Sequence, residues 1–207
     1  MKRLPLIGLC LVALVAAGCG SGSNSSGRAA AEVASGGGGG GLPSGIKGKV
    51  APRMRLPDAA SETIFDTTSL RGRPYVVTFL YTHCKTTCPV IAEELRAALG
   101  KLGPAARKVA VVGLSVDPVG DTRTTVRRWL RQHHEPRQFH YLIGPRRKLQ
   151  PLWTAWYAAA QPAGATTSIH TAAMWFVDSR GRVAGLVPAG ATVAPSTIAA
   201  KLRSLQS

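Results

Sequence analysis

The run YVVTFLYTHCKTTCP, residues 75–89, decides the fold and places the chemistry. Its first part, residues 75–81, is rich in β-branched and aromatic side chains and has the length and continuity of a buried strand. Cys84 and Cys88 follow this strand, and Pro89 suits the first position of a helix. Because chemistry in an open α/β sheet gathers beyond the carboxyl ends of the strands, we expect a functional site at the two thiols.

The spacing of the two cysteines favours chemistry over packing. A thiol at position 88 would lie at a helix N-terminus, where exposed N–H groups and the helix dipole favour a thiolate, and Lys85 adds a positive neighbour. Residues four apart can bring both sulfurs to one side of a turn, close enough to share a metal or to form a bond. The alternative is two unrelated cysteines that pack as small apolar residues.

Strand and helix signals alternate on both sides of this run. A hairpin is expected from residues 52–56 and 62–65, strands over 75–81, 109–116 and 141–143, helices over 89–102, 121–134 and 146–159, a late hairpin from 171–177 and 182–187, and a closing helix over 195–205. Asp121 is expected to cap the second helix. This order predicts a single α/β domain, with a thioredoxin-like central sheet and helices on both faces.

The N-terminus carries the marks of an exported protein. Residues 1–3 are a short basic start, and the apolar run over residues 4–17 falls short of the ~20 residues needed to span a bilayer. The small residues Ala16, Ala17 and Gly18 precede Cys19, a pattern that resembles a lipoprotein lipobox. We therefore expect a lipoprotein signal peptide over residues 1–18 and lipidation of Cys19; simple secretion and an uncleaved anchor are the alternatives.

A flexible linker separates this signal from the folded part. Residues 19–47 hold the lipidated cysteine and a Gly/Ser-rich stretch, with consecutive glycines at 36–41. Such a chain cannot bury a core, and its root-mean-square span is about 25–30 Å. We expect the domain to occupy residues 48–207, outside the cytoplasm and anchored to the cell membrane by lipid.

Cysteine usage and charge exclude two classes of protein. With Cys10 in the signal and Cys19 lipidated, two thiols remain in the domain, which excludes a disulfide-rich scaffold. The formal charge is +16, but the basic residues are scattered and lack interleaved aromatic side chains. This pattern, with export, disfavours nucleic acid. A solvated basic surface is the plain interpretation; attraction to anionic headgroups or to an acidic partner is the alternative.

A distant histidine points toward metal. Thioredoxins place a cis-proline before the strand that faces the cysteine pair. The corresponding stretch here, residues 167–171, holds no proline but contains His170. A nitrogen ligand in place of the residue that guides a substrate backbone indicates metal binding and not generic disulfide exchange.

Three ordered motifs now resemble the Sco/SenC family of copper proteins. They are TFLYTHCKTTCP at residues 78–89, SVDPVGDT at 115–122 and SIHTAAMWFVDSRGRV at 168–183, and the likeness extends over about residues 50–205. The resemblance implies a thioredoxin-like, membrane-tethered protein that helps to assemble the binuclear copper A centre of cytochrome c oxidase subunit II. It also implies that Cys84, Cys88 and His170 are the copper ligands and that Asp117 has an outer-shell role.

The chemistry of these residues agrees with copper, Cu(I) or Cu(II). Two thiolates and an imidazole suit it, and three-coordinate Cu(I) needs no fourth donor, whereas zinc normally takes one. The hypothesis is therefore a metallochaperone that delivers copper to cytochrome c oxidase subunit II or another acceptor. Lys85, Thr86 and Thr87 stand where the family usually has Pro and an acidic residue, which keeps a thiol-disulfide reductase as the alternative. A copper or redox sensor has no sequence feature of its own.

The other histidines carry less weight. His83 adjoins Cys84, and simple alternation along the chain points its ring away from the cysteine pair. His133 and His134 are expected to be solvated at the end of a basic helix. His140 lies beside a short strand with no ligand partner in sequence.

Overall fold

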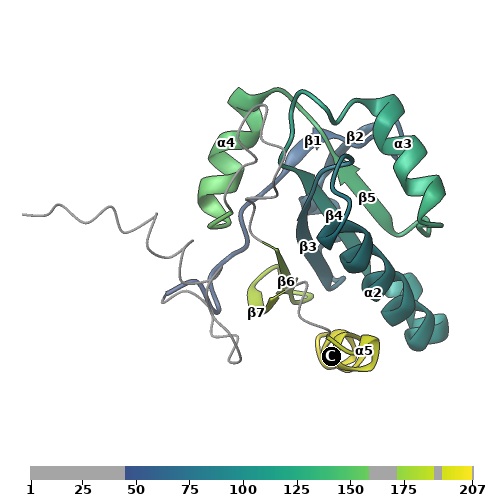
Figure 1. Ribbon diagram of the computed structural model, residues 1–207. Helices are drawn as coiled ribbons and strands as arrows, with labels where there is room; N and C mark the ends of the chain where they lie inside the picture. Colours follow the sequence, from purple (N-terminus) through teal and green to yellow (C-terminus); the bar gives the residue numbers. More distant parts are fainter. Residues whose placement is uncertain (1–44, 159–171, 189–192, 207) are drawn as a thin grey trace, which may run out of the picture.

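The computed structural model describes residues 45–158, 172–188 and 193–206. Their centre is a five-stranded sheet in the order β5–β4–β3–β6–β7 (Figure 1). β3, β4 and β5 are parallel, whereas β6 runs antiparallel to β3 and pairs with β7 as the expected late hairpin. The strands are β3 (Tyr75–Leu80), β4 (Ala110–Ser115), β5 (Phe139–Leu142), β6 (Ala173–Val177) and β7 (Val183–Pro188).

Helices cover both faces of this sheet, as predicted. The steps from β3 through α2 to β4 and from β4 through α3 to β5 run in the same direction, so right-handed crossovers place α2 and α3 on the same face. Figure 1 shows α4 on the opposite side, and α5 packs beside α2. The helices are α2 (Thr87–Leu102), α3 (Arg123–Gln132), α4 (Arg146–Ala155) and α5 (Pro195–Ser204), with 3-10 turns η1 (Thr67–Leu70) and η2 (Gly103–Lys108).

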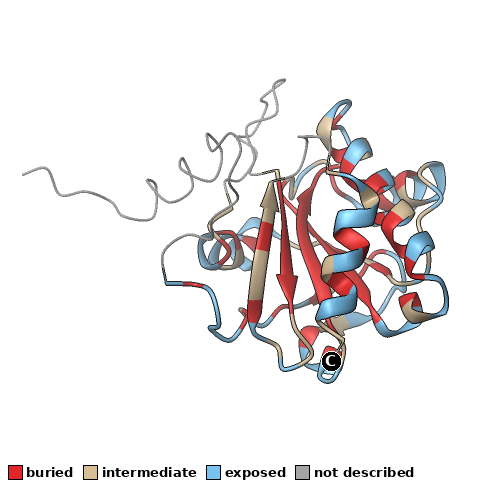
Figure 2. Ribbon diagram, turned by 90° about the horizontal axis from the view of Figure 1, so that it is seen from below, coloured by how far each residue is buried: buried red, intermediate tan, exposed pale blue. Residues whose placement is uncertain are grey.

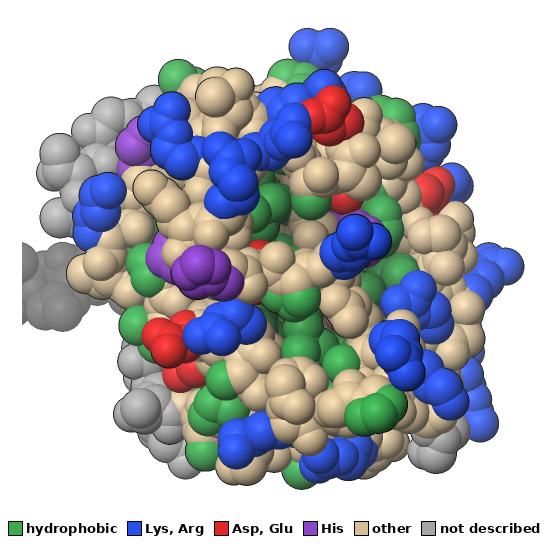
Figure 3. Space-filling view, turned by 90° about the vertical axis from the view of Figure 1, so that its right-hand side faces the viewer, with side chains coloured by type: hydrophobic (Ala, Val, Ile, Leu, Met, Phe, Trp, Pro, Cys, Tyr) green, Lys and Arg blue, Asp and Glu red, His purple; other side chains and the backbone are tan. Residues whose placement is uncertain are grey.

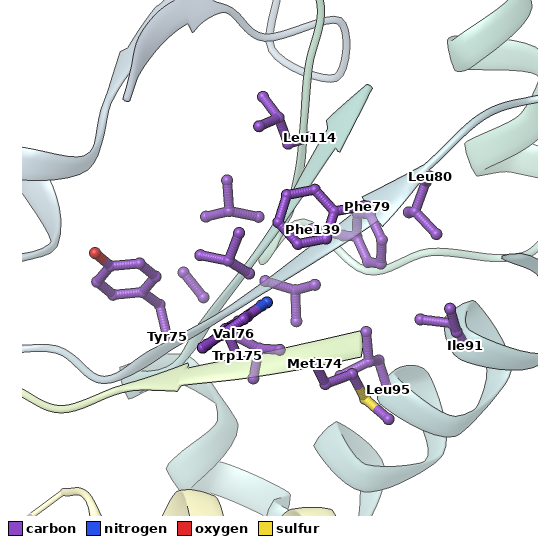
Figure 4. Close-up of a cluster of buried hydrophobic side chains, with 14 of the residues drawn as sticks. Tyr75, Val76, Phe79, Leu80, Ile91, Leu95, Leu114, Phe139, Met174 and Trp175 are labelled. Carbon is purple, nitrogen blue, oxygen red and sulfur yellow. The ribbon is translucent and has the colours of Figure 1, made fainter. Parts of the chain in front are cut away.

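The continuous apolar runs of the sequence explain the central strands. Every residue of β3 and β4 is buried, as expected for parallel strands with helices on both faces (Figure 2). On one face, Ile91 and Leu95 of α2 point toward the sheet, where Leu80 and Met174 lie (Figure 4). Ile91, Leu95, Leu99 and Leu102 are all buried, so they form the apolar side of α2 that packs on the sheet.

Two tryptophans pack α4 against the opposite face of the sheet. The rings of Trp156 and Trp175 meet edge to face with centroids 5.9 Å apart, and both side chains are fully buried. The indole N–H of Trp153 donates to the carbonyl of Ser115 at the end of β4, at 2.9 Å. These contacts hold the helix after β5 against β4 and β6.

A short hairpin protects the edge strand β5. β1 (Arg55–Pro57) and β2 (Ile64–Asp66) pair antiparallel, which confirms the predicted early hairpin. Beyond β1 the chain lies along β5, where Ile143 N donates to Pro57 O at 3.0 Å and Ala59 N donates to Tyr141 O at 2.9 Å. The hairpin therefore satisfies backbone groups that an open edge strand would expose.

The chain enters the domain at the other edge of the sheet. Gly48 N donates to Val183 O at 2.8 Å, and Ala51 N donates to Gly181 O at 2.9 Å. The first described residues thus lie along the turn between β6 and β7. Within the described ranges, no helix has the length and apolar character needed to cross a membrane.

The expected cap of α3 is wrong by one residue. Thr122 is the N-cap: its hydroxyl accepts from Thr125 N, and the Thr125 hydroxyl accepts from Thr122 N in return. The paired threonines satisfy the first turn without the help of Asp121. The carboxylate of Asp121 is free to turn inward, where it is 5% exposed.

An acidic side chain is buried where α3 leads into β5. Neither carboxyl oxygen of Glu135 has a hydrogen-bond partner among the described residues, and both are shielded from solvent. Burial raises the pKa of Glu135 to about 8, and the nearby charge of Arg96 offsets this only in part. The folded protein therefore holds a proton there at neutral pH.

This buried acid predicts a loss of stability as the pH rises. Between the ordinary pKa of Glu and about 8, the unfolded chain has lost the proton that the folded chain keeps, so unfolding is favoured as the pH increases. Glu135→Gln keeps the shape and the neutral state. We expect this variant to unfold about 2–6 °C above wild type at pH 8.5 and at the same temperature at pH 4.5, measured by circular dichroism.

Glu93→Gln is the matched control, because the Glu93 side chain is 75% exposed. It should show no such difference between the two pH values. An equal shift of Glu135→Gln at both pH values would contradict the buried, protonated state.

Candidate functional site

The two cysteines lie beneath the surface at the carboxyl end of β3. Cys84 is 3% exposed and Cys88 is fully buried, and both are in the reduced thiol form. The loop turns back on itself where Cys84 N donates to Tyr81 O at 3.2 Å. Between the thiols, Lys85 and Thr86 are exposed, so the loop shows its polar side chains to solvent and keeps its sulfurs inside.

A sulfur atom takes part in capping α2. Thr86, the N-cap residue, makes no side-chain capping bond, and the helix begins at Thr87. Instead Cys88 N donates to Cys84 Sγ at 3.3 Å. This bond satisfies one of the free N–H groups in the first turn. The prediction that residues 84 and 88 share one side of a turn is confirmed.

The expectation that the helix N-terminus favours a Cys88 thiolate is wrong for this reduced pair. A hydrogen bond with Cys84 and burial raise the pKa of the Cys88 thiol, and the charge of Asp121 acts in the same direction. The hydrogen bond with Cys84 is the largest of these causes, and a backbone hydrogen bond at Tyr81 opposes it only in part. A metal ion that binds here must therefore displace a proton.

Asp121 anchors the cysteine loop through hydrogen bonds with Thr82. Its Oδ1 accepts from Thr82 N and Thr82 Oγ1, both at 2.8 Å. Its Oδ2 accepts from Ser115 Oγ at 2.7 Å and from Tyr141 OH at 3.0 Å. Burial raises the pKa of Asp121, although these bonds act in the opposite direction. One carboxylate thus joins the cysteine loop to the ends of β4 and β5.

Sequence reasoning missed this role. It placed Asp121 on the helix as a cap, because an acid before a helical run is typical of that position. The available signal was its place in the motif SVDPVGDT, after a buried strand that ends at the same edge as the cysteines. Only the fold shows that Thr82, Ser115 and Tyr141 converge on it.

Asp117 belongs to the surface of the same edge. Its Oδ1 accepts from Val119 N at 3.2 Å and from Gly120 N at 2.9 Å, and its Oδ2 lies 3.7 Å from Nδ1 of the exposed His83. A Cβ at Gly120 would lie 2.2 Å from that Asp117 oxygen and 2.7 Å from the His83 nitrogen, so a larger residue there would require these side chains to move. The outer-shell role of Asp117 stays a prediction.

Two of the candidate residues lie outside the described residues, namely His170 and Cys19. Within the described part of the chain, no three His, Cys, Asp or Glu side chains are grouped to hold a metal ion. The structure therefore brings together Cys84 and Cys88 from the predicted ligand set.

Of the remaining described histidines, His133 and His140 have structural partners. The His133 ring packs on Trp129 with centroids 4.3 Å apart, so the expectation of full solvation is wrong for it, whereas His134 is exposed. His140 Nδ1 lies 2.9 Å from Asp58 Oδ2 and its ring stacks on Phe65. Each contact explains its histidine without a metal.

Comparison with known proteins fixes the family. The SCO1/SenC family model matches residues 47–207. The chain belongs to the SCO1/SenC family. No curated protein matches it, so solved structures provide the detailed likeness.

Solved Sco structures share its fold, which confirms the predicted thioredoxin-like sheet. ScoI of Bradyrhizobium japonicum, solved with copper bound, is 27% identical, with a TM-score of 0.65 over 76% of this chain and 99% of that one. A SCO1/SenC family lipoprotein of Bacillus anthracis is 19% identical, with a TM-score of 0.68 over 77% and 96%. BsSco, a member of the Sco family of cytochrome c oxidase assembly proteins with a disulfide switch, is 18% identical, with a TM-score of 0.66 over 76% and 93%.

The donor atoms of this SCO1/SenC chain fit copper. Two buried sulfurs on adjoining turns are soft ligands in a site shielded from water. The nearest carboxylate, Asp121, has both oxygens occupied by protein donors. The sulfur atoms of Cys84 and Cys88, and not the Asp121 oxygens, are therefore the donors that this part of the site offers to a metal.

Removal of the Asp121 carboxylate should loosen this edge of the domain. Asp121→Ala would strip partners from one buried backbone N–H and from three hydroxyl groups. We expect the free energy of unfolding to fall by about 2–4 kcal/mol, measured by urea denaturation of the reduced protein.

Asp117→Ala serves as the control, since it removes a half-buried carboxylate from the same loop. Its cost should stay below about 1 kcal/mol. Equal losses in the two variants would refute the anchoring role of Asp121.

Proposed function

We propose that this protein binds copper through Cys84, Cys88 and His170 and delivers it to cytochrome c oxidase subunit II during assembly of the copper A centre. The observation that carries the proposal is the buried sulfur pair, in which Cys88 N bonds to Cys84 Sγ. Family membership and the copper-bound Bradyrhizobium relative support the choice of metal.

The residues of the chain have separate tasks in this proposal. Cys84 and Cys88 supply thiolates, and their protons leave as the metal binds. His170 closes the site as the nitrogen donor. Asp121 holds the loop through Thr82 so that the sulfurs stay adjacent. Transfer then proceeds by stepwise exchange of these ligands for cysteines of the acceptor, and a Cys84–Cys88 disulfide blocks loading.

The N-terminal segment ties this activity to a membrane. In the proposal, residues 1–18 are removed as a lipoprotein signal, Cys19 is lipidated, and residues 19–47 tether the domain outside the cytoplasm. The basic start, the short apolar run and the small residues before Cys19 support it. The lipoprotein of Bacillus anthracis with the same fold gives it further support.

A thiol-disulfide reductase is the second candidate function. The adjacent reduced thiols favour it, because such a pair can close into a disulfide while it reduces a partner. The disulfide switch of BsSco supports this chemistry on the same fold. In this alternative the protein keeps the copper-site cysteines of an acceptor reduced.

Copper retention tests the ligand set. We expect the reduced full-length protein to bind one Cu(I), measured by competition with a chromogenic chelator. Cys84→Ser and Cys88→Ser should abolish this binding, because each removes one of two soft donors. His170→Ala should weaken retention at least tenfold, because it removes the third ligand. In wild type loaded with Cu(II), a thiolate-to-copper absorption band should appear.

His134→Ala is the matched control, because His134 is an exposed histidine elsewhere on the domain. It should leave affinity within twofold of wild type. Equal effects of the two histidine variants would reject His170 as a ligand. Metal-free turnover of a protein disulfide that survives His170→Ala but stops in Cys84→Ser would favour the reductase.

The anchor has its own test. In cells that express the full chain and are fed a labelled fatty acid, the wild-type protein should carry label in the membrane fraction. Cys19→Ala should carry none, because the thiol that accepts the diacylglyceryl group is gone. Cys10→Ala, a cysteine within the predicted signal, should label as wild type does. Label that persists in Cys19→Ala would rule out this attachment site.

A further inference from the structure

A second concave site lies beside β5, separate from the cysteines. A pocket of about 500 Å³ is enclosed by α3, the start of β5 and the turn at residues 58–61 that joins β1 to β2. Figure 3 looks onto the side where α3 lies and shows hydrophobic side chains in a hollow, with several Lys and Arg side chains, and also His and acidic side chains, around it. Leu130 and Phe139 supply apolar lining. This volume is in the range of small-molecule sites.

Three guanidinium groups line this pocket. Arg127 and Arg131 are one turn apart on α3, so they lie on the same side of the helix, and Arg137 comes from the segment that leads into β5. Arg127 is paired with Glu62. Within the described ranges, neither Arg131 nor Arg137 forms an ion pair or a side-chain hydrogen bond. The pocket therefore has uncompensated positive charge.

The acids in the lining do not neutralise it. Asp58 accepts from four donors of its own surroundings: Ala60 N, Ser61 Oγ, Tyr141 N and His140. Glu135 has both oxygens shielded from solvent, and burial raises its pKa to about 8, so it carries no charge at neutral pH. Asp58 keeps its negative charge, because its hydrogen bonds outweigh the effect of burial and lower its pKa, but it offsets only one of the two charges of Arg131 and Arg137. A ligand can supply the remaining negative charge.

We infer that this pocket binds a small organic anion, a phosphate or carboxylate group on an apolar body. The free guanidinium forks of Arg131 and Arg137 match the paired oxygens of such a group. Leu130, which is only partly buried, offers the apolar body a surface to cover. An acidic protein segment would need the arginines but not the apolar surface beside them, so the small anion is the better match.

Phenyl phosphate is the probe, because it joins a dianion to a ring. We expect the full-length protein to bind one molecule by isothermal titration calorimetry at low salt, at least tenfold more tightly than inorganic phosphate. Arg131→Gln and Arg137→Gln should each weaken binding at least tenfold. Arg128→Gln, an exposed arginine on the same helix outside the pocket, should stay within twofold of wild type.

Ala60→Trp separates a pocket from diffuse surface charge. It fills the hollow from the exposed turn at residue 60 and removes no charge. Loss of phenyl phosphate binding in this variant, with an unchanged unfolding temperature, would support the proposal. Binding that survives Ala60→Trp, or that falls equally in Arg128→Gln, would overturn it. So would tighter binding of hexaglutamate than of phenyl phosphate, since this would indicate an acidic protein partner.

Discussion

The buried carboxylate of Asp121 is the contact on which the cysteine site depends. It binds the backbone and hydroxyl of Thr82, the hydroxyl of Ser115 and the phenol of Tyr141. Three segments that are distant in sequence meet at this one group: the loop after β3, the end of β4 and the middle of β5. Because it is shielded from water, its bonds are worth more than exposed ones, and its loss would leave several buried groups unpaired. Because Cys84 comes two residues after Thr82 in the same loop, the contacts that hold Thr82 also help to position Cys84.

Sequence patterns predicted the architecture because its decisive elements are strongly patterned. The continuous apolar runs fit buried strands, which they form as β3 and β4, and the apolar residues of α2 recur at helical spacing. The late hairpin is likewise indicated by two strand-like runs joined by a short turn. Helix ends were less predictable: α2 begins at Thr87, not Pro89, and α4 ends at Ala155. The environment of a side chain was least predictable, because the burial of Asp121 and the raised pKa of Cys88 depend on neighbours brought together only by folding.

Cys84 serves the fold and the chemistry with the same atom. Its sulfur accepts the hydrogen bond from Cys88 N that satisfies the start of α2, and it is also the soft donor proposed for copper. A serine oxygen at this position can still accept that hydrogen bond, whereas it is a poor ligand for Cu(I). Cys84→Ser therefore separates the two roles, since the helix keeps its partner while the metal loses its ligand.

The chain enters the domain at the end of β3 opposite the thiols. Residues 48–51 lie along the turn between β6 and β7, and that turn adjoins the Tyr75 end of β3, since Tyr75 is in register with Val177. The cysteine loop leaves β3 at its other end, about 17 Å away at the rise of a strand. The sulfurs consequently lie at the end of the sheet remote from the point where the N-terminal segment joins the domain, so a protein that approaches them does not meet that segment there.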